Sequence, residues 1–193
     1  VTGGRHGINV QNRRKVGNIG KTSITVGATS TITTSAVGGY GILNRMAEYN
    51  DDNESFVPLS KSDVSNVITV AGTINTTGDG AHGIVQDGGT SIANISGTVS
   101  AKGNSAAAVF HKFGSGHTVN LAESAKIIGS ISAANNASNN KLNLNEDADF
   151  ELTIGGAPNE GELGQGTGPG QWTLTVVDEQ GLRASTQSSD RQK

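Results

Sequence analysis

The sequence contains no cysteine, so it offers neither a disulfide framework nor a thiolate metal site or nucleophile. Only 4% of its residues are aromatic, which excludes a large core built on Phe, Tyr and Trp. No apolar run is long enough to cross a bilayer, and the first residues, VTGGRHGINV, lack the charged start and apolar centre of a signal peptide. We therefore expect a soluble chain whose interior is filled by small aliphatic side chains.

The net charge is also small. A formal charge of -3 and a pI near 5.8 provide no basic face for nucleic-acid phosphates, so nucleic acid is disfavoured as a partner.

The 193 residues suffice for one substantial core, which favours a single domain. The 28 glycines, set against 3 prolines, indicate frequent turns.

A short motif recurs along the chain. It reads HGI at 6–8, YGI at 40–42, HGI at 82–84 and, in degraded form, AAV at 107–109. The apolar residues Ile8, Ile42, Ile84 and Val109 are 34, 42 and 25 positions apart. Self-similarity at periods of about 20 to 50 residues is typical of repeat architectures.

Two further runs follow this first run. The second run reads SITV at 23–26, VITV at 67–70, SIANI at 91–95, HTVNL at 117–121 and KLNLN at 141–145. The third run reads TIT at 31–33, TIN at 73–75, TVS at 98–100, SIS at 130–132 and LTI at 152–154. Runs rich in β-branched residues and bounded by Gly, Asn, Asp or Ser are typical of short strands between turns. Each unit therefore predicts three strands.

The predicted architecture is an all-β parallel β-helix, a solenoid with three strands per coil and about five coils over residues 1–154. Strand alternation directs Ile24, Val26, Ile68 and Val70 inward, and Thr25 and Thr69 outward. If strands of successive coils pair about 4.8 Å apart, their first runs form one interior column, which consists of Ile8, Ile42, Ile84 and Val109.

The longest unit contains an insertion at residues 44–63, NRMAEYNDDNESFVPLSKSD. Its carboxylates and its proline favour an exposed corner loop over an internal strand. Binding residues vary most freely on such insertions, so this loop is the predicted partner-binding element. The predicted contact residues are Arg45, Tyr49, Asp51, Asp52 and Phe56.

The repeat fades after residue 154. Residues 155–180 combine a glycine-rich connection with WTLTVV at 172–177, an alternating run that predicts a last strand or cap. Residues 181–193 are predicted to be a flexible tail.

The repeat style, clearest in ITVAGTINTTGDGAHGI, resembles bacterial autotransporter passenger domains of the pertactin and adhesin kind. The resemblance covers roughly residues 1–154 and implies a right-handed helix. It also implies export, folding at the bacterial cell surface or secretion, and attachment to an outer-membrane β-barrel in a longer precursor. The absence of cysteine fits passage of an unfolded chain through a narrow pore.

Candidate catalytic and metal-binding residues are few. Ser115 and His117 lie close together in FGSGH, but a glycine-serine-glycine turn before a strand explains the pattern without catalysis. His6 and His82 occupy equivalent positions about two coils apart, too far for one metal ion, and are interpreted as partly exposed turn residues bonded to loop backbone.

Charged clusters have plain interpretations as well. Glu146, Asp147 and Asp149 could ligate calcium, although they lack the nonapeptide spacing of calcium-binding β-rolls. The basic segment NRRK at 12–15 is interpreted as a solvated corner, with a heparin or acidic-glycan contact as the alternative.

The sequence thus predicts a non-catalytic adhesin or virulence factor that needs no cofactor and is not itself inserted in a membrane. Its expected partners are a host cell-surface protein, a matrix component or glycan, or a sister cell. Two alternatives remain. One is a structural stalk or self-association segment, in a passenger or a phage-type fibre; the other is a polysaccharide lyase or glycoside hydrolase, which would need carboxylates converging in one groove.

Overall fold

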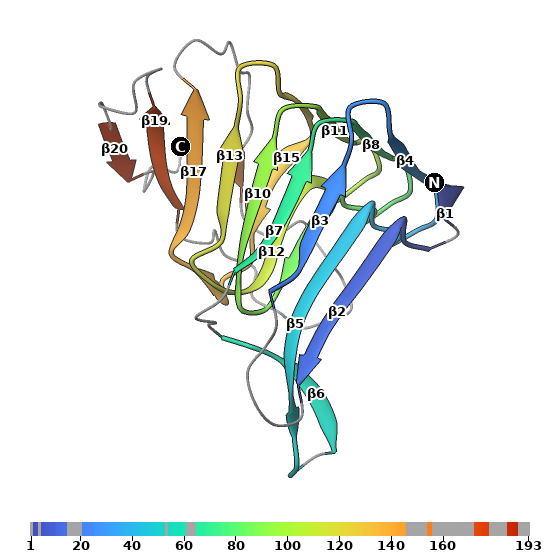
Figure 1. The fold of residues 1–193 in the computed structure, drawn as a ribbon, viewed down its shortest axis with the longest axis vertical. Helices are drawn as coiled ribbons and strands as arrows, with labels where there is room; N and C mark the ends of the chain where they lie inside the picture. The colour runs from blue at the N-terminus through green and yellow to red at the C-terminus, as the bar shows by residue number, and fades with distance from the viewer. Residues whose placement is uncertain are drawn as a thin grey trace.

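The computed structural model describes residues 2–3, 5–14, 21–52, 54–60, 65–145, 154–155, 172–177 and 185–188. In these residues every regular element is a β-strand, and the strands form three sheets (Figure 1). Among the same residues there is no helix long and apolar enough to cross a membrane. The all-β prediction is confirmed.

The first sheet collects the first runs. Its strands, in chain order, are β2 (Ile8–Arg14), β5 (Ile42–Asn50), β9 (Ile84–Asp87), β12 (Ala107–Ser115), β15 (Ser130–Ala133) and β18 (Ile154–Gly155). Two short strands attach to it, β6 (Ser55–Pro58) beside β5 and β16 (Ala137–Ser138) beside β12.

The second sheet collects the second runs, and the third sheet the third runs. The second contains β3 (Ser23–Val26), β7 (Ser65–Val70), β10 (Thr90–Ile95), β13 (Thr118–Leu121), β17 (Asn140–Asn145), β19 (Trp172–Val177) and β20 (Ser185–Ser188). The third contains β1 (Thr2–Gly3), β4 (Thr31–Thr34), β8 (Thr73–Thr76), β11 (Thr98–Ala101) and β14 (Lys126–Ile128).

Four successive repeats, from β2 to β14, each give one strand to each sheet. From β2 to β14 the chain visits the first, second and third sheets in that order, with the hairpin strand β6 as the exception. Each strand pairs in parallel with its equivalent in the neighbouring repeat; the antiparallel pairs are β5 with β6 and β19 with β20. The predicted three strands per repeat are therefore present from β2 to β14.

The predicted interior column is confirmed. Ile8 is the register partner of Ile42, Ile42 of Ile84, and Ile84 of Val109. Ile42, Ile84 and Val109 are fully buried, and all four residues belong to one hydrophobic cluster. The inward residues of the second sheet join this cluster, as predicted: Ile24, Val26, Ile68 and Val70. Stacked aliphatic side chains thus supply the burial that the few aromatic residues cannot.

A glycine of the repeated motif lies where two backbones approach closely. The amide of Gly41 donates to the carbonyl of His82 at 2.9 Å. A Cβ on Gly41 would lie 2.4 Å from Cγ2 of Ile74 and 2.6 Å from the carbonyl oxygen of Gly83. Glycine is required there because it leaves room for the backbone of the neighbouring repeat and for the core.

Two third-run assignments are wrong. Ser130–Ala133 forms β15, which pairs with β12 in the first sheet, and Ile154 of the LTI run pairs there with Ile131. The third-sheet strand of that repeat is β14, Lys126–Ile128, which pairs with β11. The sequence SIS has the same polar-apolar-polar pattern as TIT, so alternation alone does not distinguish the two sheets.

The expected corner loop at 44–63 is also wrong in part. Residues 44–50 continue strand β5, which pairs with β2 as far as Glu48, and Ser55–Pro58 pairs antiparallel with its end. Asn44, Met46 and Ala47 are fully buried. Proline is tolerated because Pro58 lies in β6, an attached hairpin strand outside the main path of the sheet.

At the other end, WTLTVV forms the predicted strand as β19, which pairs in parallel with β17 in the second sheet. Within the segment predicted as a tail, Ser185–Ser188 pairs antiparallel with β19 as β20. An antiparallel strand there covers the open edge that β19 would otherwise present.

Candidate functional site

The hairpin of β5 and β6 projects away from the three sheets, at the bottom of Figure 1. Its register pairs Ala47 with Pro58 and Asn50 with Ser55. At its base the amide of Leu59 donates to the carbonyl of Met46 at 3.0 Å, and their two side chains form a small buried cluster. The hairpin is therefore anchored by packing at its root and exposed at its tip.

The flank of the hairpin bears a cluster of one cationic and two aromatic side chains. The rings of Tyr49 and Phe56 meet edge to face, with centroids 5.3 Å apart. The guanidinium carbon of Arg13, on β2, lies 5.0 Å from the centroid of the Phe56 ring. Phe56 nevertheless remains 40% exposed, and among the described residues Val37 is the other large apolar side chain that is exposed. We call Arg13, Tyr49 and Phe56 the hairpin patch.

The structure does not bring all five predicted contact residues together. Tyr49 and Phe56 are in contact, and Asp51 and Asp52 lie exposed in the turn, where the amide of Asp52 donates to Oδ1 of Asn50 at 2.8 Å. Arg45 lies instead on the part of β5 that pairs with β9.

Arg45 forms an ion pair with Asp87. Its Nε donates to Oδ2 of Asp87 at 2.7 Å, and its terminal nitrogen lies 2.6 Å from the same oxygen. The Asp87 side chain is only 2% exposed, so the pair compensates a carboxylate that is removed from water. Arg45 thus has a structural partner within the chain.

The basic segment at 12–15 differs from its prediction as well. Asn12 and Arg13 belong to β2 rather than to a corner. Asn12 directs its amide to the buried Asn66, 3.4 Å away, and Arg13 extends over Phe56. Sequence reasoning missed this link between Arg13 and the hairpin because the two segments are far apart in the chain.

The histidines of the HGI motif stack with aromatic neighbours. His6 and Tyr40 have ring centroids 5.0 Å apart, and Tyr40 and His82 5.3 Å apart. Each histidine accepts a backbone hydrogen bond through Nδ1, His6 from Tyr40 and His82 from Ala107, as expected. His82 is fully buried rather than partly exposed, because the ring of Phe110 packs 4.7 Å from it.

Ser115 and His117 do not form a catalytic pair. Oγ of Ser115 accepts a hydrogen bond from Asn139, whereas Nε2 of His117 donates to the carbonyl of Phe113 at 2.7 Å. His117 is fully buried beside His111, with ring centroids 4.9 Å apart. Burial lowers the pKa of His117 to about 4, against the opposing effects of the Phe113 carbonyl and Asp87.

His111, the imidazole that packs beside His117, is also fully buried, and sequence reasoning did not single it out. Its Nδ1 lies 2.7 Å from Oδ1 of Asn140. Burial, followed by the proximity of His117, holds the pKa of His111 well below its ordinary value. Both rings are therefore neutral at physiological pH and serve as packing groups.

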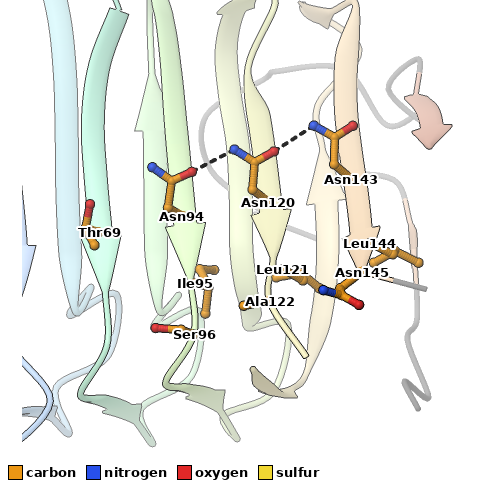
Figure 2. Close-up of a pocket in the computed structure, with 10 residues that line it drawn as sticks. All are labelled: Thr69, Asn94, Ile95, Ser96, Asn120, Leu121, Ala122, Asn143, Leu144 and Asn145. Atoms are coloured by element: carbon orange, nitrogen blue, oxygen red, sulfur yellow. Dashed lines mark hydrogen bonds between the residues drawn. The ribbon is translucent and has the colours of Figure 1, made fainter. Parts of the chain in front are cut away.

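A shallow groove of about 470 Å³ crosses the outer side of the second sheet (Figure 2). Three asparagines on consecutive strands form a ladder along it. The amide of Asn120 donates to Oδ1 of Asn94 at 2.7 Å, and that of Asn143 to Oδ1 of Asn120 at 2.6 Å. The described lining residues are Thr69, Asn94, Ile95, Ser96, Asn120, Leu121, Ala122, Asn143, Leu144 and Asn145. We call these residues the asparagine groove.

Sequence reasoning missed this groove, although a signal was present. In SIANI, HTVNL and KLNLN an asparagine precedes the last apolar residue of the run. Aligning the second runs would have placed the three amides in one column.

The calcium candidates Glu146, Asp147 and Asp149 lie outside the described residues. Among the residues that are described, no group of three or more His, Asp or Glu side chains has the arrangement to hold a metal ion.

Comparison with known proteins adds no relative. No protein-family model, no curated protein and no solved structure matches the chain.

Proposed function

We propose that the three sheets are the faces of a right-handed parallel β-helix, and that this helix is a non-catalytic segment presenting the β5–β6 hairpin to a protein partner. The confirmed column of Ile8, Ile42, Ile84 and Val109 and the regular order of the sheets support the helix. Its handedness follows the usual hand of parallel crossover connections.

The main support for the binding role is the exposure of Phe56 on a hairpin that projects from the sheets and is anchored by packing at its base. An aromatic ring held by Tyr49 and Arg13 loses little side-chain freedom when a partner covers it, and aromatic and arginine side chains dominate the energetics of protein interfaces. The partner would be a host receptor, a matrix component or a sister cell. A position at the bacterial cell surface or in the medium is part of the proposal and rests on the resemblance of the repeats to autotransporter passengers.

Binding of the purified chain to immobilised fibronectin, laminin and collagen, and to cultured epithelial cells, tests the proposal. Phe56→Ser should reduce binding to the recognised surface by about tenfold, the effect of losing one interface anchor. Val37→Ser is the matched control, because Val37 is 78% exposed and lies away from the hairpin, between β4 and β5.

Thermal unfolding should be the same for both variants, since each replaces a surface side chain. Equal binding by Phe56→Ser and the unchanged chain would reject the hairpin patch as the contact site. Binding to none of these surfaces, together with reversible self-association in sedimentation, would favour a stalk or self-association segment.

A further inference from the structure

We propose that the asparagine groove is a second binding site, which binds a neutral, linear oligosaccharide. This site is separate from the hairpin, lies on a different sheet and goes beyond the protein-binding role proposed above. It rests on three observations: spare hydrogen-bonding groups at a regular spacing, a partly buried leucine beside the last of them, and uncharged lining residues.

The first observation concerns the ladder itself. A carboxamide has two N–H donors and an acceptor oxygen. In the ladder, Asn120 and Asn143 each use one donor, and the oxygens of Asn94 and Asn120 are the acceptors. Among the described residues nothing takes the second donor of Asn120 or Asn143, either donor of Asn94, or the oxygen of Asn143. The groove therefore offers spare polar groups on three consecutive strands.

Strand pairing fixes the spacing of these groups. Asn94, Asn120 and Asn143 are register partners across β10, β13 and β17, so they repeat at the strand separation of about 4.8 Å. Figure 2 shows the three amides in line across the strands. A linear chain of pyranose rings that crosses the strands would bring hydroxyl groups past successive amides, whereas a compact ligand would use only one.

The second observation is an apolar side chain at one end of the ladder. Ile95 and Leu121 line the groove but are only 2% and 3% exposed and belong to the hydrophobic core, whereas Leu144, next to Asn143, is only partly buried. A sugar ring has hydroxyl groups at its edge and C–H groups on its faces, so a ring at this end could hydrogen-bond to an amide and also pack against Leu144. Ligand sites commonly combine a few placed polar groups with apolar contacts.

The third observation separates neutral from charged ligands. The described lining residues are asparagine, serine, threonine, alanine, isoleucine and leucine, so none contributes a charge. A sulfated or uronic-acid chain would lose water from its anionic groups without gaining a cation from these lining residues. The groove accordingly favours a neutral saccharide over an acidic one.

The test is a titration of the full chain with cellohexaose, chitohexaose and a heparin-derived hexasaccharide, followed by the side-chain amide signals in NMR. At least one neutral hexasaccharide should shift the signals of the three ladder amides, with a dissociation constant in the range of about 0.1 to 1 mM. The heparin fragment should bind more weakly.

Asn120→Thr is the decisive variant. It removes the central amide, yet threonine suits this position because Thr25 and Thr69 occupy the same outward column on β3 and β7. Affinity for the neutral probe should fall about tenfold, the effect of losing one or two hydrogen bonds. Asn143→Thr, at the end of the ladder, should act in the same direction and provides a second variant should Asn120→Thr fold poorly.

Asn75→Thr is the matched control. Asn75 is an outward asparagine on the third sheet, between Thr33 and Ser100 in register, and the same substitution there should leave binding unchanged. Phe56→Ser should also leave it unchanged, which keeps failure of this site distinct from failure of the hairpin.

Several outcomes would overturn the assignment. These are no shift with either neutral probe at 20 mM, unchanged affinity in both ladder variants, an equal loss in Asn75→Thr, or tighter binding of the heparin fragment. Self-association that Asn120→Thr abolishes, without saccharide binding, would assign the groove to a second copy of the chain.

Discussion

Acidification should destabilise the fold through His117. The ring is fully buried, its Nε2 donates to the carbonyl of Phe113, and its Nδ1 has no hydrogen-bond partner among the described residues. Protonation would place a charge and an unpaired donor at Nδ1 in a fully buried site. The folded chain therefore holds the neutral ring, and the pKa of His117 lies at about 4.

The sign and size of the effect follow from linkage. A histidine of the unfolded chain has a pKa of about 6.5, so between pH 6.5 and 4 the unfolded state binds a proton that the folded state refuses. The full stabilising contribution is present above pH 6.5 and is lost progressively as the pH falls towards 4. Between pH 7.5 and 5.0 the loss from His117 alone is about 2 kcal/mol. The lowered pKa of His111 acts in the same direction.

Urea unfolding at pH 7.5 and 5.0, followed by circular dichroism, measures this loss. His117→Gln keeps a possible donor to Phe113 but does not titrate, so the variant should lose less stability over the same pH interval. His6→Gln is the control, because the His6 ring is only partly buried and its lowered pKa has correspondingly less effect. The reasoning would be refuted by equal unfolding midpoints at the two pH values, or by an unchanged pH response in His117→Gln.

Two further predictions concern the sheet interior. Arg45→Met should lower the free energy of unfolding by about 3 kcal/mol in urea titration, because Asp87 stays buried without its cation. Adding Asp87→Asn should restore part of this stability. A double variant no more stable than Arg45→Met would contradict the assignment of the loss to the unpaired carboxylate. Gly41→Ala should cost about 2 kcal/mol in the same assay, since its Cβ would meet Ile74 and the backbone of Gly83. The control is Gly27→Ala, whose Cβ would meet only Oγ of Ser30 at 3.6 Å; an equal cost in the two variants would show that the close approach is unimportant.

The stacked core was predictable because its signals are local and repeated. Alternating β-branched residues place Ile68 and Val70 on one side of a strand, and the recurring motif aligns Ile42 with Ile84 without any knowledge of distant contacts. The third-run error at Ser130–Ala133 arose where that motif was absent, since a three-residue pattern fits either sheet equally well.

The candidate sites were less predictable because they depend on contacts between distant segments. The polar composition of 44–63 correctly predicted that Asp51 and Asp52 are exposed. It also led to the prediction of a loop where the chain continues as a strand that buries Met46. The ion pair of Arg45 with Asp87 requires the register of β5 with β9, and the position of Arg13 over Phe56 requires that of β2 with β5. No local pattern contains these registers.

The direction of strand pairing has a mechanical consequence. The hydrogen bonds between neighbouring repeats run from strand to strand, across β3, β7, β10, β13 and β17, so a load applied between the first and last strands of this series pulls these bonds lengthwise. Under such tension the strands would separate one after another, as in a zipper, whereas a load along a single strand would have to shear all of its bonds together. The chain should therefore yield gradually to stretching across its repeats and resist abruptly when it is pulled along a strand.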